Sequence, residues 1–187
     1  MHAKITQYRI RCARKLQGNI LDIGAGEGGY TNYLGANVVS LDLDLENLKN
    51  IPGKKVLASA MHLPFPDNTF DGVWSCAVLE HVETNFIPEA IRVTKQGGTL
   101  FILTPNRHSP YDPLKKLCGL GDWWSNEGHV RLYSVRELRA FGKVCGEVWW
   151  APVLDQLSRI LPSLGHTLML RIDVNSNNKR NPLNYDA

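Results

Sequence analysis

Residues 20–42 read ILDIGAGEGGYTNYLGANVVSLD and decide the fold of this chain. They contain a short apolar run, an acidic residue, closely spaced glycines, a helical pattern and a second apolar run that ends in Asp42. Glycines are needed where a strand turns sharply, because the backbone bends tightly there and a ligand must approach it closely. This order predicts a nucleoside-cofactor site at the ends of two strands.

Two cofactor classes are compatible with these glycines. Gly24, Gly26 and Gly29 satisfy the G-x-G-x-x-G pattern of dinucleotide sites, and Asp42 follows near the spacing of a ribose-binding acid. Read from Asp22, the same loop is D-x-G-x-G-x-G, which places a carboxylate beside the ligand. That carboxylate would repel a pyrophosphate and attract the ammonium and sulfonium groups of S-adenosylmethionine. The charge pattern favours S-adenosylmethionine, with the dinucleotide as the alternative.

The composition is that of an ordinary globular protein. Of 187 residues, 43% are hydrophobic and 21% are charged, which suits one domain with a sizeable core. The sequence shows neither an apolar stretch of membrane-spanning length nor the apolar segment of a secretory signal, so we expect a cytoplasmic protein. Its four cysteines are scattered singly, and we expect neither disulfides nor a metal site.

Residues 1–18 are expected to form a basic amphipathic helix. The net charge of the chain is only +3, but five of its basic residues lie in this segment: Lys4, Arg9, Arg11, Arg14 and Lys15. A solvated outer face explains them, and contact with RNA or lipid headgroups is the alternative. A nucleic-acid partner is not favoured, and the oligomeric state is not predicted.

Apolar runs alternate with helical patterns along the chain, as in a mainly parallel sheet with helices on both faces. The runs predict strands over 19–23, 37–42, 54–58, 70–76, 98–104, 144–150 and 166–173. The helical patterns predict helices over 28–35, 44–50, 84–95, 134–142 and 153–162. A long aperiodic connection over 105–132 follows a strand end, where open α/β sheets bind ligands. We expect one domain over 1–174 and a disordered tail over 175–187.

Three ordered blocks carry a family resemblance. They are the glycine loop, ASAMHLPFPDNTFDGVWSCAVLEHV at 58–82 and EAIRVTKQGGTLFILTPN at 89–106. Together they resemble the class I S-adenosylmethionine-dependent methyltransferases, and among these the type 11 methyltransferase family. The resemblance implies an α/β fold with a Rossmann-like, doubly wound seven-stranded sheet in three αβα layers. The implied strand order is 3-2-1-4-5-7-6, with the last strand antiparallel.

The same resemblance implies that S-adenosylmethionine is the cofactor and which residues hold it. Its methionine end is expected at the glycine loop, its ribose at Asp42, and its adenine after the second and third strands. The implied cofactor residues are Asp22, Gly24, Ala25, Gly26, Asp42, Leu43, Ala60, Met61, Cys76 and Ala77. Ser59 stands where the family pattern has an aspartate, so a hydroxyl replaces a carboxylate near the adenine amino group.

Methyl transfer mainly requires that acceptor, methyl and sulfur are aligned and water is excluded. A base is needed only when the acceptor must lose a proton, and histidine is suited to that task near neutral pH. His81 is the first candidate base because it follows the fourth strand on the substrate side, and His129 and His108 come after it. Three aromatic residues are expected to line an acceptor pocket: Tyr111, Trp123 and Trp124.

The sequence thus predicts an S-adenosylmethionine-dependent methyltransferase that acts on a small-molecule or lipid-like acceptor. One alternative is a catalytically inactive methyltransferase-like partner subunit, which the substitution at Ser59 motivates. A nicotinamide-dependent oxidoreductase is a further alternative, supported only by the overlapping glycine pattern and Asp42.

Overall fold

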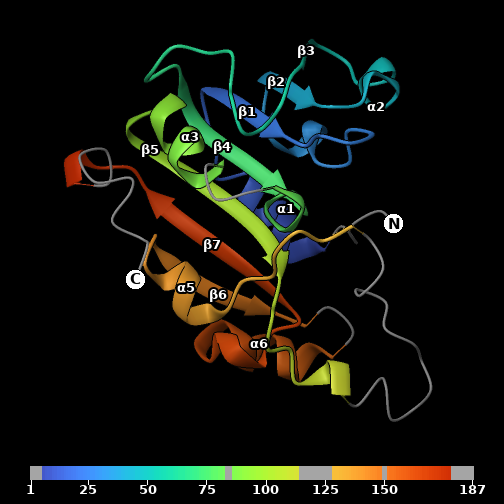
Figure 1. Ribbon diagram of the computed structural model, residues 1–187, viewed down its shortest axis with the longest axis vertical. Coiled ribbons are helices and arrows are strands. Elements are labelled where there is room, and N and C mark those ends of the chain that lie inside the picture. The colour runs from blue at the N-terminus through green and yellow to red at the C-terminus, as the bar shows by residue number, and fades with distance from the viewer. Residues whose placement is uncertain (1–5, 83–85, 114–127, 149–150, 178–187) are drawn as a thin grey trace.

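The computed structural model describes residues 6–82, 86–113, 128–148 and 151–177. Within them, one seven-stranded sheet occupies the centre of the molecule, with order β3-β2-β1-β4-β5-β7-β6 (Figure 1). The strands are β1 Asn19–Ile23, β2 Asn37–Asp42, β3 Lys54–Leu57, β4 Phe70–Cys76, β5 Thr94–Pro105, β6 Lys143–Glu147 and β7 Thr167–Asp173. Only β7 pairs antiparallel with its neighbours β5 and β6. The predicted strand order and the antiparallel last strand are confirmed.

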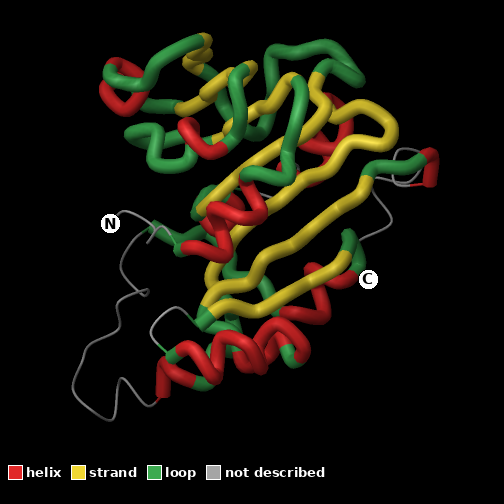
Figure 2. The backbone as a smooth tube through the Cα atoms, turned by 180° about the vertical axis from the view of Figure 1, so that it is seen from behind, coloured by secondary structure: helices red, strands yellow, loops and turns green. Residues whose placement is uncertain are grey.

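Short helices surround the sheet (Figure 2). The α-helices are α1 Gln7–Ala13, α2 Leu45–Lys49, α3 Phe86–Val93, α5 Val135–Arg139 and α6 Pro152–Ile160. The described residues also form single turns of 3-10 helix at η1 Thr31–Tyr33, η2 Leu79–His81 and η3 Pro162–Leu164. In the described part of the chain, no helix is both long and apolar enough to cross a bilayer.

The core lies on both faces of the sheet, because successive residues of a strand point to opposite sides. In β4, Val73 packs in the cluster that contains Phe86 of α3, whereas Trp74 packs in the cluster that contains Ala13 of α1. The Trp74 ring lies 5.0 Å from the ring of Tyr30, between centroids. Two apolar layers therefore cover the sheet, and the three-layer αβα arrangement is confirmed.

The predicted helix over 28–35 is wrong, since this segment forms only the single turn η1. Gly28 and Gly35 have φ angles of +80° and +98°, which a right-handed helix does not contain. Tyr30 and Leu34 are both buried, and their spacing of four residues produced the helical pattern. Here a compact loop buries the same apolar residues.

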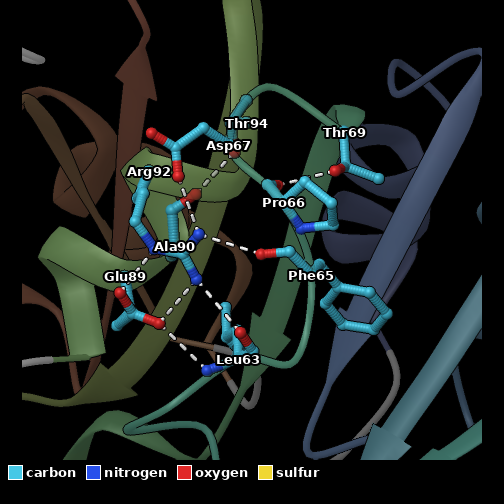
Figure 3. Close-up of polar contacts among 9 residues, drawn as sticks. All are labelled: Leu63, Phe65, Pro66, Asp67, Thr69, Glu89, Ala90, Arg92 and Thr94. Carbon is cyan, nitrogen blue, oxygen red and sulfur yellow. Dashed lines mark hydrogen bonds and ion pairs between the residues drawn. The ribbon is translucent and has the colours of Figure 1, made fainter.

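The segment between β3 and β4 is fastened to α3 by Arg92, as Figure 3 shows. The Arg92 guanidinium donates to the carbonyl oxygens of Leu63 and Phe65 at 3.0 and 2.9 Å. It also contacts the carboxylates of Asp67 and Glu89 at 2.8 and 2.6 Å. Glu89 in turn accepts from the Leu63 amide at 2.9 Å. This network fixes the position of the segment around Leu63, which follows β3 in the chain.

The N-terminal helix is shorter than the predicted helix over 1–18, since α1 ends at Ala13, and its outer face is less basic than predicted. Arg9 points inward and is 3% exposed, and its Nε lies 2.6 Å from Oε2 of Glu147 at the end of β6. Thr6 donates its hydroxyl to the other oxygen of Glu147 at 2.5 Å. Arg9 therefore joins α1 to the sheet, and Arg11, Arg14 and Lys15 remain exposed.

Candidate functional site

A cavity of about 750 Å³ opens at the carboxyl ends of β1, β2 and β4. In open α/β sheets this edge is where ligands bind, and the volume lies within the usual range for small-molecule sites. Every predicted cofactor residue except Met61 lines this cavity: Asp22, Gly24, Ala25, Gly26, Asp42, Leu43, Ala60, Cys76 and Ala77. Segments that are far apart in the sequence thus line one cavity.

Two glycines shape the turn after β1. Gly24 has a φ of +66°, and a Cβ there would lie only 2.1 Å from Cγ2 of Val78, so the close approach of these segments requires glycine. Gly26 has a φ of +52°, and a Cβ there would have no atom within 4 Å. Because Gly26 lines the cavity, its missing side chain leaves room for a ligand beside the loop backbone.

Asp22 is a buried carboxyl group at the end of β1. It is 3% exposed and accepts a hydrogen bond from the Thr31 hydroxyl at 3.2 Å. Burial, with a smaller contribution from the charge of Asp42, raises the pKa of Asp22 to about 7. A cationic group in the cavity would stabilise the ionised form of this carboxyl.

Asp42 ends β2 and is held by three donors of neighbouring segments. Its Oδ2 accepts from the Gly26 amide at 2.8 Å, and its Oδ1 accepts from the Asp44 amide at 2.9 Å and from Nδ2 of Asn47 at 3.3 Å. These contacts fix the carboxylate at the wall of the cavity. Asn47 also lines the cavity, although sequence reasoning did not identify it.

Other wall residues were missed for a common reason. They are apolar or aromatic positions whose role depends on the packed fold: Tyr30, Leu41, Ala58, Trp74 and Val82. Trp74 looked like a core residue of a buried strand, and it is one, with a fully buried ring. Glu27 also lines the cavity, and its place inside the glycine loop was the signal that could have identified it. Gly29, the last glycine of the dinucleotide pattern, lines the cavity as well.

Some predicted site residues lie elsewhere. Met61 is half-buried and packs against the α3-side core, and the Ser59 hydroxyl accepts from the Met61 amide at 3.2 Å. Tyr111 follows β5 and does not line the cavity. His108 is exposed beyond the end of β5. The predicted residues Trp123 and Trp124 lie outside the described residues.

The two leading histidine candidates meet at the rim of the cavity. His81 lines the cavity and is exposed, and its ring centroid lies 5.0 Å from that of His129. The segment that carries His129 is fastened to η2, because the amides of Val130 and Arg131 donate to the Glu80 carbonyl at 2.8 and 3.2 Å. Distant parts of the sequence thus form one group of side chains.

Glu80 is the buried member of this group, and sequence reasoning did not identify it. It is 1% exposed, and its Oε2 accepts from the Thr104 hydroxyl at 3.1 Å. Burial raises the pKa of Glu80 to about 7. No spacing pattern in the sequence joins Glu80 and His81 to His129, because His129 lies in a loop that is remote in sequence.

Comparison with known proteins agrees with this geometry. A family model described as a methyltransferase domain matches residues 21–102. An uncharacterized protein of Methanocaldococcus jannaschii is 30% identical over 174 residues, covering 82% of this chain and 77% of that protein. The chain belongs to the class I S-adenosylmethionine-dependent methyltransferases, type 11 family. The cofactor of this methyltransferase family member is S-adenosylmethionine.

Two further proteins are similar to this family member. The 2-methyl-6-phytyl-1,4-hydroquinone methyltransferase of Synechocystis is 31% identical over 160 residues, covering 72% of this chain but only 50% of that enzyme. The solved structure of an S-adenosylmethionine-dependent methyltransferase of Thermotoga maritima superposes with a TM-score of 0.64. It is 18% identical, with 87% of this chain and 85% of that chain covered, so it supports the fold alone.

The residues present fit S-adenosylmethionine better than a dinucleotide. A dinucleotide site presents its pyrophosphate to the start of an α-helix, and the described segment after the glycine loop forms only η1. The buried carboxyl of Asp22 borders the same loop and would oppose a pyrophosphate. An ammonium group there would instead compensate its charge.

Proposed function

We propose that the chain transfers a methyl group from S-adenosylmethionine to a small-molecule or lipid-like acceptor. The single observation that carries the proposal is that Asp22, the open face of Gly26 and Asp42 border one cavity of about 750 Å³. Each of the three suits a different part of the cofactor. We place the methionine ammonium near Asp22, the backbone of the cofactor over Gly26, and the ribose hydroxyls at Asp42.

The remaining cofactor contacts are proposed from the same wall. Leu43 and Ala60 lie on the β2 and β3 side of the cavity, where the adenine would stack against apolar surface. Cys76 and Ala77 follow β4 and would run along the methionine part. Met61 is not needed for this arrangement, because it packs against the core.

The acceptor is proposed to approach from the His81 rim. His81, Val78 and Val82 line this part of the cavity, and they belong to η2 and its two flanking residues, which follow β4. In a direct displacement, the acceptor attacks the methyl carbon on the side opposite sulfur, and the cofactor leaves as S-adenosylhomocysteine. His81 or His129 would accept a proton where the acceptor must lose one.

The name of the Synechocystis relative supports an acceptor of the hydroquinone type with an apolar tail. The proposed function takes residues 1–174 as one methyltransferase domain.

Titration calorimetry with S-adenosylhomocysteine tests the cofactor part of the proposal. We expect one site per chain, with weaker binding after Asp42→Ala and no change after substitution of the exposed residue Asn32→Ala. Absence of binding at millimolar ligand would refute the proposal. Formation of S-adenosylhomocysteine from S-adenosylmethionine in the presence of hydroquinones with and without an apolar tail then tests the acceptor class.

A further inference from the structure

Three metal-ligating side chains gather at the rim of the cavity. One ligand atom from each of Glu80, His81 and His129 lies within 4.8 Å of the other two. We propose that these three residues bind one divalent transition-metal ion of the Zn²⁺ type beside the cofactor. Two imidazoles and one carboxylate are a donor set that such ions take in catalytic sites.

The hydrogen bonds behind the cluster orient these donors as a metal site requires. His81 Nδ1 lies 3.2 Å from the Gly128 carbonyl oxygen, which can only accept, so Nδ1 carries the proton. The lone pair of His81 is then on Nε2. Metal-binding histidines usually donate their second ring N–H to such a carbonyl or carboxylate. On the other side, the Thr104 hydroxyl holds one oxygen of Glu80 at 3.1 Å.

The cluster is also fixed by the backbone. The amides of Val130 and Arg131 donate to the carbonyl of Glu80, so the loop with His129 is fastened to η2 with Glu80 and His81. Tetrahedral Zn²⁺ places its ligand atoms about 3.4 Å apart, which follows from its bond lengths. In the structure the three ligand atoms lie within 4.8 Å of one another. His81 is exposed, so a small rotation of its ring can bring its ligand atom to the separation that zinc requires.

Charge favours a cation at this place. Glu80 is 1% exposed, and its side chain accepts from the neutral hydroxyl of Thr104. A hydroxyl satisfies a lone pair but does not compensate the charge of a buried carboxylate. A divalent ion bound to Glu80 would compensate that charge.

Among the residues that the structure describes, three would ligate the proposed ion, which leaves a coordination position open. Catalytic metal sites keep such a position for water or substrate, whereas structural sites have four protein ligands. His81 is both a member of the cluster and a wall residue of the cavity, so the ion would border the path of the acceptor. The site would therefore select an acceptor that offers an oxygen atom.

This inference rests on the proposed function and narrows its acceptor to a hydroxyl compound. A hydroxyl bound to the ion loses its proton to solvent, and its oxygen then forms a bond to the methyl carbon. The C–S bond breaks, and its electron pair stays on sulfur. His81 and His129 would then be ligands, and neither would act as the base.

Zinc binding tests the site directly. The full chain, first treated with a chelator, is titrated with zinc sulfate by calorimetry, and its zinc content is measured after dialysis. The variants are His129→Ala and Glu80→Gln, and the matched control is His62→Ala, because His62 is an exposed histidine outside the cavity wall. Circular dichroism checks that each variant is folded, and His129→Ala provides the test if the buried change in Glu80→Gln prevents folding.

We expect one zinc per chain, binding at least about 100-fold weaker in His129→Ala, and unchanged binding in His62→Ala. The visible spectrum of a Co²⁺-loaded sample should lose its bands in the same variant. Zinc binding that is absent, or equal in His129→Ala and the parent, overturns the metal site. A parallel titration of the zinc-free chain with S-adenosylhomocysteine judges the proposed function separately, since we expect the cofactor to bind without zinc.

Discussion

Lowering the pH from about 8 to about 6 should weaken the binding of S-adenosylhomocysteine about tenfold, because Asp22 takes up a proton. Burial raises the pKa of Asp22 to about 7, and the ionised form is the one that attracts the ammonium of the ligand. With that pKa, about nine tenths of the free protein is ionised at the higher pH and about one tenth at the lower pH. The tenfold ratio of these ionised fractions corresponds to about 1.4 kcal/mol of binding free energy.

The sign for folding stability is opposite. The folded chain holds the Asp22 proton up to about pH 7, whereas the unfolded chain releases it near the ordinary value of 3.8. Between these two values the native state binds more protons, so the contribution of Asp22 to stability is lost as the pH rises. Across this window the ionisation of Asp22 should therefore lower the stability of the free protein while it increases the affinity for the ligand.

Titration calorimetry at several pH values measures the effect, with two variants as controls. Asp22→Asn should bind weakly with a flat pH profile, which separates the effect of Asp22 from that of Glu80, whose pKa is also raised to about 7. Thr31→Val removes the hydrogen bond that favours the ionised carboxyl of Asp22. The midpoint of the pH profile of ligand binding should therefore move upward by about one pH unit in this variant. A flat profile in the parent, or the same slope in Asp22→Asn, would refute the reasoning.

Four further predictions concern other contacts. Asp42→Ala should weaken S-adenosylhomocysteine binding about tenfold in calorimetry, since the carboxylate would lose its hydrogen bonds to the ribose, and an unchanged dissociation constant would contradict this role. Gly24→Ala should destabilise the fold in urea denaturation because its Cβ would meet Val78 at 2.1 Å. Gly26→Ala should cost only about 1–2 kcal/mol of stability but abolish ligand binding, and equal binding in this variant would contradict the proposed path of the cofactor. Arg92→Met should lower the free energy of unfolding by about 2 kcal/mol, because the carbonyls of Leu63 and Phe65 lose their donor, and an unchanged urea midpoint would disprove that role.

The sheet could be predicted from the sequence because each buried strand is an apolar run with clear boundaries. The strands over 19–23, 37–42 and 70–76 agree with β1, β2 and β4 to the residue. The start of β5 was placed too late, since Gly97 and Gly98 suggested a helix end. In the structure the helix ends at Val93, and Thr94 already pairs with Phe70.

The cofactor side of the site could be predicted better than the rim. Its residues follow strand ends, and their order along the chain reveals the edge of the sheet at which they meet. The rim depends on contacts between segments that are remote in sequence. Glu80 joins His129 only because two backbone amides attach the later loop to η2. The spacing of residues along the chain does not predict these hydrogen bonds.

The ion pair between Arg9 and Glu147 bears on the order in which the molecule assembles. The hydroxyl of Thr6 and the carboxylate of Glu147 meet across 141 positions of sequence. Contacts of such large separation form late, because a long loop must close before they contribute. During synthesis, α1 therefore has no Glu147 partner until β6 has left the ribosome. Because α1 packs against Tyr30, Trp74 and Cys76 of the cavity wall, the ion pair that fastens α1 to the sheet there is completed only after β6 has been synthesised.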